Sequence, residues 1–170
     1  MSVSMYQASV PVLVRVLSNF IVVLEKAQAH AAAKKLDPLV LTGFRLFPDM
    51  LPLTKQVQIA SDMAKGGGAR LAGAEVPKYE DNETTFDELV ARLDKTIEFL
   101  RGLDPKAFEG SESKEIVLPM RSGPVKFKGQ DYLFNFVLPN VYFHAATGYN
   151  ILRHNGVDIG KMDFLGKLEG

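Results

Sequence analysis

His144 is the residue whose type and position most strongly suggest chemistry, because it falls on the apolar stripe of a predicted helix over residues 130–154. Asn140 precedes it by four positions, so the two side chains share one face of that helix. Gln56 and Gln58 lie on an earlier predicted helix, on either side of its apolar stripe. Imidazole and carboxamide groups that face each other in a helical bundle can bind a polar ligand or coordinate a metal.

A lone histidine on an apolar face is also typical of a core residue whose ring nitrogens are satisfied by hydrogen bonds. A zinc, nickel or iron site normally needs two or three imidazole or carboxylate ligands, and asparagine and glutamine carbonyls are poor substitutes. Tyr142 lies on an adjacent face of the same helix as His144. The candidates for a ligand pocket are therefore Gln56, Gln58, Asn140, Tyr142 and His144, with His144 as the candidate metal ligand.

Composition limits the class of protein. The 170 residues suit one domain over residues 1–170, and a hydrophobic content of 46% is enough for a substantial core. The 20 basic and 20 acidic residues give a formal net charge of zero, which argues against nucleic acid as a partner because phosphate binding needs a basic surface. The absence of cysteine excludes disulfides, thiolate metal sites and a cysteine nucleophile.

The N-terminal residues match neither a secretory signal nor a transmembrane helix. They lack a basic start, Arg15 interrupts the apolar region, and the apolar residues recur at helical spacing. We therefore expect a cytoplasmic protein with no membrane partner. The balanced charge also gives little electrostatic repulsion between copies, so self-association is not opposed.

Hydrophobic periodicity predicts two helices in the first half of the chain. Apolar residues recur three, four or seven positions apart over residues 4–35, which predicts one long helix that is ended by Asp37 and Pro38. A second helix follows from about Met50. The apolar pattern predicts that this helix ends at the three glycines of residues 66–68. Alternatively, the helix continues through them if a neighbouring helix crosses closely at the glycines.

The second half of the chain predicts two more helices and a hairpin. Thr85 and Glu88 match a capping box, which predicts the start of a third helix. Alternating apolar residues over 114–128 predict a β-hairpin with its turn at residues 121–123. The last helix contains Pro139, which should kink it. Four amphipathic helices with a small hairpin before the last one predict an all-α four-helix bundle.

Four segments carry a family resemblance: RLFPDMLPLTKQVQIASDMAK (residues 45–65), ARLAG (69–73), LPNVYFHAATGYNILRHNGV (138–157) and IGKMDFLG (159–166). They resemble a bacterial family of unknown function within the DinB/YfiT-like superfamily of predicted metalloenzymes, and the resemblance covers essentially the whole chain. It implies a four-helix bundle with crossover connections, in agreement with the periodicity. It also implies a homodimer, because many members of the superfamily are homodimers.

The resemblance further implies where a metal site would lie. The superfamily typically uses three histidines, one on the second helix and two, four apart, on the last. His144 occupies the place of the second histidine of that pair, and Asn140 stands in the place of the first. Gln56 or Gln58 is nearest to the place of the remaining ligand. One of the three ligands is thus retained.

Two functions fit these residues. The first is a homodimeric domain that binds a small ligand or a partner and carries a degenerate metal site. The second is a metal-dependent enzyme, of the thiol S-transferase or hydrolase type, in which His144 holds a zinc, nickel or iron ion with Asn140, Gln58 or water. Such a metal would activate a thiol or water by lowering its pKa. The types of side chain present favour the first function.

Overall fold

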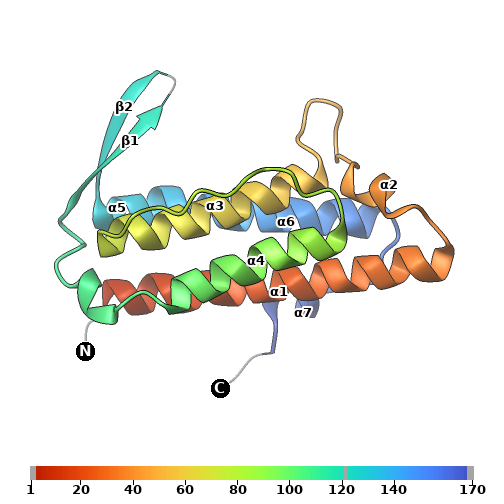
Figure 1. The fold of residues 1–170 in the computed structure, drawn as a ribbon, viewed down its shortest axis with the longest axis horizontal. Coiled ribbons are helices and arrows are strands. Elements are labelled where there is room, and N and C mark those ends of the chain that lie inside the picture. The colour runs from red at the N-terminus through yellow and green to blue at the C-terminus, as the bar shows by residue number, and fades with distance from the viewer. Residues whose placement is uncertain (1–2, 121, 168–170) are drawn as a thin grey trace.

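Four long helices lie side by side and form the body of the molecule (Figure 1). In the computed structural model, which describes residues 3–120 and 122–167, these are α1 (Met5–Lys34), α3 (Leu53–Ala72), α4 (Phe86–Arg101) and α6 (Leu138–His154). The shorter helical elements are α2 (Pro38–Thr42), α5 (Gly129–Tyr132), α7 (Lys161–Leu165), the 3-10 turn η1 (Pro105–Phe108) and the π-helical turn η2 (Leu133–Val137). The strands β1 (Glu115–Met120) and β2 (Gly123–Lys128) form an antiparallel hairpin before α5 and α6. The predicted all-α four-helix bundle with a small hairpin is confirmed.

The connection from α1 to α2 differs from the prediction. The first helix ends at Lys34, because Lys35 adopts the left-handed conformation with φ 55°. Asp37 and Pro38 do not end this helix but begin the next one. The Asp37 side chain accepts a hydrogen bond from the backbone N–H of Leu39 at 2.9 Å, and Pro38 occupies the first turn, where a missing N–H leaves no hydrogen bond unmade.

The second long helix, α3, continues through the glycines of residues 66–68. A Cβ added at Gly67 would lie 2.6 Å from Val137, and one added at Gly68 would lie 2.5 Å from Leu100. The glycines therefore let α3 approach the last helix on one side and α4 on the other more closely than larger residues would allow. This is the condition under which the helix was expected to continue.

The predicted last helix is continuous from Gly129 to His154 but contains the π-helical turn η2. Pro139 lies two positions after the end of this turn, near the start of α6. A π-turn rearranges the backbone hydrogen bonds, which accommodates a proline that has no N–H to donate. Asn140 Nδ2 donates to the carbonyl of Phe136 at 2.7 Å and so satisfies one acceptor of the turn. The irregularity predicted at Pro139 thus takes the form of a π-turn.

Residues 73–85, which we call the crossover segment, run in extended form along α3 and α4 (Figure 1). The segment ends at Thr85, and the predicted capping box between Thr85 and Glu88 is confirmed. In the hairpin, Ile116 and Leu118 of β1 are buried, and they pair with Phe127 and Val125 of β2. The hairpin projects from the end of the bundle that holds α5 (Figure 1). Arg121, within the predicted turn, lies outside the described residues.

The core is a single cluster of apolar side chains shared by the long helices and β1. Within the described part of the chain, α1 is the one helix long and apolar enough to cross a membrane by length and composition. Its apolar stripe is used in this core instead, where Leu13, Leu17 and Leu24 are 0% exposed. Full burial of each such leucine contributes roughly 1.5–3 kcal/mol to the stability of the fold.

Candidate functional site

His144 of α6 and Gln56 of α3 meet where these two helices pack together. Nδ1 of His144 lies 2.7 Å from Oε1 of Gln56, and Nε2 of Gln56 donates to the backbone carbonyl of Leu51 at 2.9 Å. A backbone carbonyl can only accept, so it fixes the amide of Gln56 with Oε1 towards His144. Since Oε1 also only accepts, Nδ1 must carry the proton. Leu51 therefore sets the tautomer of His144 through Gln56.

The environment of His144 favours the neutral ring. Burial lowers the pKa of His144 below its ordinary value, because removing the imidazolium from water is unfavourable. Gln56 is almost fully buried, and the ring of Phe143 stands edge-on to the imidazole with centroids 5.2 Å apart. With Nδ1 protonated and the ring neutral, Nε2 carries a lone pair. At neutral pH, His144 therefore offers one hydrogen-bond acceptor, or one potential ligand atom, from a partly exposed ring.

The other predicted site residues do not gather around this pair. Two positions along a helix correspond to a rotation of about 200°, so Gln58 faces away from Gln56 and donates to Glu83 at 2.8 Å. Tyr142 is 42% exposed and lines a different open cavity, of about 860 Å³, beside the start of α1. Asn140 shares the helix face of His144, although its amide nitrogen is bonded to the backbone of the π-turn.

The donor set at His144 does not fit a zinc, nickel or iron ion. Nowhere in residues 3–120 and 122–167 do three histidine, aspartate, glutamate or cysteine side chains lie in positions that could hold a metal ion. Both polar atoms of Gln56 are already bonded to His144 and Leu51, so Gln56 does not replace the histidine that the superfamily resemblance implies. Nε2 of His144 remains as one imidazole donor, whereas such ions need two or three.

A second polar cluster, which the sequence did not predict, lies between α3, α4 and the crossover segment. The Arg92 side chain is 2% exposed and contacts three carboxylates: Glu83 at 2.9 Å, Asp62 at 2.9 Å and Asp81 at 3.1 Å. Its Nε donates to Ser61 Oγ at 3.2 Å. Burial alone would lower the pKa of Arg92, but the hydrogen bond and the surrounding negative charges raise it.

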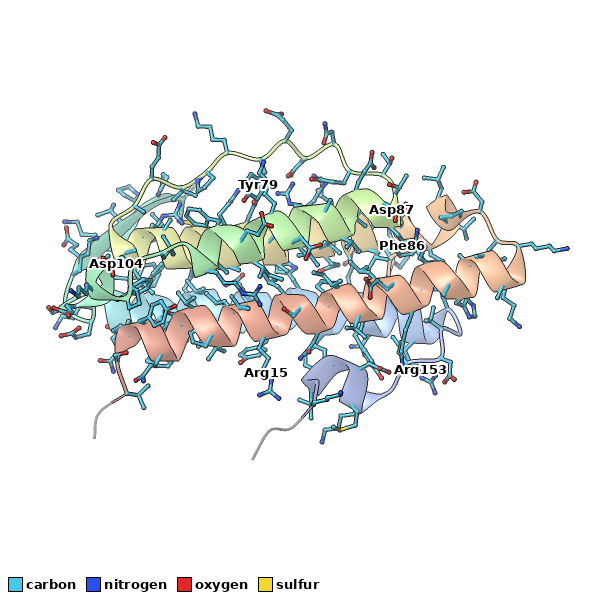
Figure 2. All side chains as sticks on the ribbon, turned by 60° about the horizontal axis from the view of Figure 1, so that its bottom comes forward. Arg15, Tyr79, Phe86, Asp87, Asp104 and Arg153 are labelled. Atoms are coloured by element: carbon cyan, nitrogen blue, oxygen red, sulfur yellow. The ribbon has the colours of Figure 1, made fainter. Side chains whose placement is uncertain are left out.

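Lys65 and Tyr79 extend this cluster. Lys65 Nζ lies 2.9 Å from Oδ1 of Asp62 and 3.7 Å from the centroid of the Tyr79 ring. Figure 2 shows Tyr79 on the crossover segment, above the helices that the segment covers. Lys55 pairs with Asp81 at 3.0 Å, so three cations balance the three carboxylates. Because Asp81 and Glu83 belong to the crossover segment, these ion pairs attach the segment to the bundle. In the sequence, only Arg92 could have indicated this cluster. It is a cation three positions after Leu89, on a mostly apolar helix face.

Comparison with known proteins agrees with the helical-bundle fold. Residues 5–165 match the family described as a domain of unknown function, DUF1993. The chain is also similar to the crystal structure of a DinB family member protein from Shewanella denitrificans, at 39% sequence identity and a TM-score of 0.91, over 96% of this chain and 93% of that one. No curated protein matches the chain. The chain therefore belongs to the DUF1993 family and has a DinB-like fold.

Proposed function

We propose that this domain binds a small ligand or a partner chain at the face that carries His144, that it acts as a homodimer, and that His144 is a hydrogen-bonding residue rather than a metal ligand. The observation that carries the proposal is the chain of hydrogen bonds from Leu51 through Gln56 to His144. It leaves Nε2 as an acceptor for an N–H or O–H group of the bound molecule.

Exposed apolar side chains beside this pair support a binding role. Phe143, whose ring contacts the imidazole, is 57% exposed, and Leu51, whose carbonyl holds Gln56, is 45% exposed. Phe47, in the same loop as Leu51, is 63% exposed. Large apolar groups gathered in one region are characteristic of interaction surfaces. The formal net charge of zero places no electrostatic barrier against a second copy.

Metal analysis separates this proposal from the metal-dependent enzyme. Protein purified without added metal is analysed for zinc, nickel and iron, and its thermal unfolding is compared with and without each ion. We expect no stoichiometric metal and no rise in Tm. A stoichiometric ion that wild type retains, that His144→Ala loses and that the control His30→Ala keeps would overturn the proposal in favour of the enzyme.

Sedimentation velocity at micromolar concentration tests the homodimer. We expect a dimer for wild type and a shift towards monomer for Phe47→Ser and Phe143→Ser. Val117→Ser is the matched control, because Val117 is also an exposed apolar residue, at 46%, but lies on the hairpin. A wild-type protein that is monomeric under these conditions removes the homodimer from the proposal and leaves the ligand to be tested alone.

A further inference from the structure

A separate cavity lies near the other end of α3, under the hairpin. It has a volume of about 640 Å³ and is bounded by α3, the crossover segment, β1 and the helical turns around Tyr132 and Phe136. Cavities of roughly 300–1,000 Å³ are typical of small-molecule sites. Arg70, on its wall, is 14 positions after Gln56, or about 21 Å along the helix, so this cavity is independent of the His144 face.

Arg70 is a cation with no carboxylate partner among the described residues. Its Nη1 donates to the hydroxyl of Tyr132 at 3.1 Å, and none of the ion pairs formed within residues 3–120 and 122–167 includes it. Among the other charged side chains that line the cavity, the buried Lys65 pairs with Asp62, and the exposed Lys78 and Glu80 are opposite in charge. The cavity therefore presents one uncompensated positive charge, on a planar group that can bind a carboxylate through two parallel hydrogen bonds.

Gly66 makes room for this guanidinium. A Cβ at Gly66 would collide with Nη1 of Arg70, four positions later on the same face of α3. Any other residue at position 66 would therefore push the Arg70 side chain away from its contact with Tyr132. The glycine keeps the guanidinium folded against the helix backbone, at the edge of the cavity.

Tyr132 supplies a second donor beside Arg70. Its side chain is 1% exposed, its oxygen accepts from Arg70, and no described residue accepts the proton of its hydroxyl. Burial raises the pKa of Tyr132, so the hydroxyl stays protonated at neutral pH. The ring stacks on Phe136, with centroids 5.9 Å apart, and this pair gives the cavity an aromatic wall. Leu118 and Met120 of β1 line it with aliphatic groups.

We propose that this cavity binds a small monocarboxylate with a flat apolar body. The carboxylate is held by the guanidinium of Arg70 and the hydroxyl of Tyr132, and the apolar body lies against Phe136, Leu118 and Met120. The net charge of +1 on the side chains that line the cavity matches one negative charge better than the double charge of a phosphate monoester.

The test uses 2-naphthoate and its neutral isostere 2-naphthamide as probes of the full chain. Each is titrated into ¹⁵N-labelled wild type and followed by ¹H–¹⁵N correlation spectra. We expect saturable shifts at Arg70, Leu118 and Tyr132, and an affinity for the amide at least about tenfold weaker because the charge-assisted hydrogen bonds are lost. Equal affinity for the two probes, no saturation by the acid, or shifts confined to the His144 face would each overturn the proposal.

Variants then test whether the guanidinium of Arg70 binds the carboxylate of the probe. Arg70→Met should weaken binding of 2-naphthoate at least about tenfold, whereas Arg101→Met, on an exposed position of α4, should leave it unchanged. Gly66→Ala keeps every charge but displaces the guanidinium, so it should weaken binding as well. Circular dichroism checks the fold of each variant, and the comparison of acid with amide on wild type decides the question if a variant unfolds. Wild-type affinity in a folded Arg70→Met variant would refute the role of Arg70.

Discussion

Gln56 Oε1 accepts a hydrogen bond from Nδ1 of His144 at 2.7 Å, although the two residues are 88 positions apart in the chain. The bond places a carboxamide where a metal-binding histidine is implied by the superfamily resemblance. Gln56 also fixes the tautomer of His144, because its amide oxygen accepts the hydrogen bond and the proton must therefore be on Nδ1. The protonation of His144 is therefore the property that Gln56 controls.

Replacing Gln56 with glutamate should raise the pKa of His144. In wild type, burial lowers this pKa, whereas a carboxylate at position 56 would accept from Nδ1 and stabilise the imidazolium. Titration of the histidine ring signals by NMR measures the change, with His30 in the same spectra as an internal control. An unchanged pKa for His144 in Gln56→Glu would show that the hydrogen bond does not form in solution.

Removing the guanidinium of Arg92 should strongly destabilise the fold. Arg92→Met leaves Glu83, Asp62 and Asp81 without their shared cation. The pair with Glu83 is mostly buried, and loss of one partner from such a pair costs about 3 kcal/mol or more. Arg92→Lys should recover little of this, because an ammonium group cannot reach all three carboxylates in the same geometry. Urea unfolding measures both variants. A loss no larger than that of the exposed control Arg101→Met would contradict the prediction.

Adding one methyl group at Gly67 should destabilise the contact between α3 and the last helix. The new Cβ would lie 2.6 Å from Val137, a β-branched residue with little rotamer freedom in a helix. We expect a cost of about 1–3 kcal/mol from overpacking, reduced by the roughly 1 kcal/mol gain in helix propensity.

The double variant Gly67→Ala/Val137→Ala should recover part of that loss, because it removes the clashing methyl groups. Gly102→Ala is the control, since its Cβ would make only ordinary contacts at 3.5 Å. Additive effects of the two single substitutions in urea unfolding would argue against a direct contact.

Glu88 should contribute stability that depends on pH. Backbone hydrogen bonds from Thr84 and Thr85 lower the pKa of Glu88 from 4.5 to about 2. The folded-state pKa is therefore below the unfolded one, so the contribution is complete above pH 4.5 and is lost as the pH falls towards 2. NMR titration of the Glu88 carboxyl checks the pKa. Glu88→Gln should show a shallower decrease in stability over this pH range, and an equal decrease would exclude the carboxylate as its source.

Periodicity predicted the long helices because each buries one apolar stripe, but the connections depend on single residues. Asp37 and Pro38 form an N-cap followed by a proline in the first turn, and the same pair can also follow the end of a helix. Only the left-handed Lys35 shows that α1 has already ended. The π-turn likewise had no signal in the sequence beyond Pro139.

The residues of the candidate sites could be predicted only in part, because the sequence does not show which neighbouring element each polar side chain faces. Gln56 and Gln58 are equally polar, and the choice between them depends on which neighbouring helix each one faces. Arg92 was recognisable as a charge on an apolar stripe, but two of its partners, Asp81 and Glu83, come from an irregular segment without periodicity. Arg70 and Tyr132 are brought together only by the packing of the two helices.

The π-turn has a consequence for how this protein can change in evolution. A π-turn is an α-helix with one inserted residue that its wider turn absorbs, so deleting the exposed Asn135 would leave a regular α-helical turn in its place. Tyr132 before the turn would keep its contact with Arg70, and His144 after it would keep its bond to Gln56. The turn can therefore gain or lose one residue in a relative while both proposed binding surfaces keep their geometry.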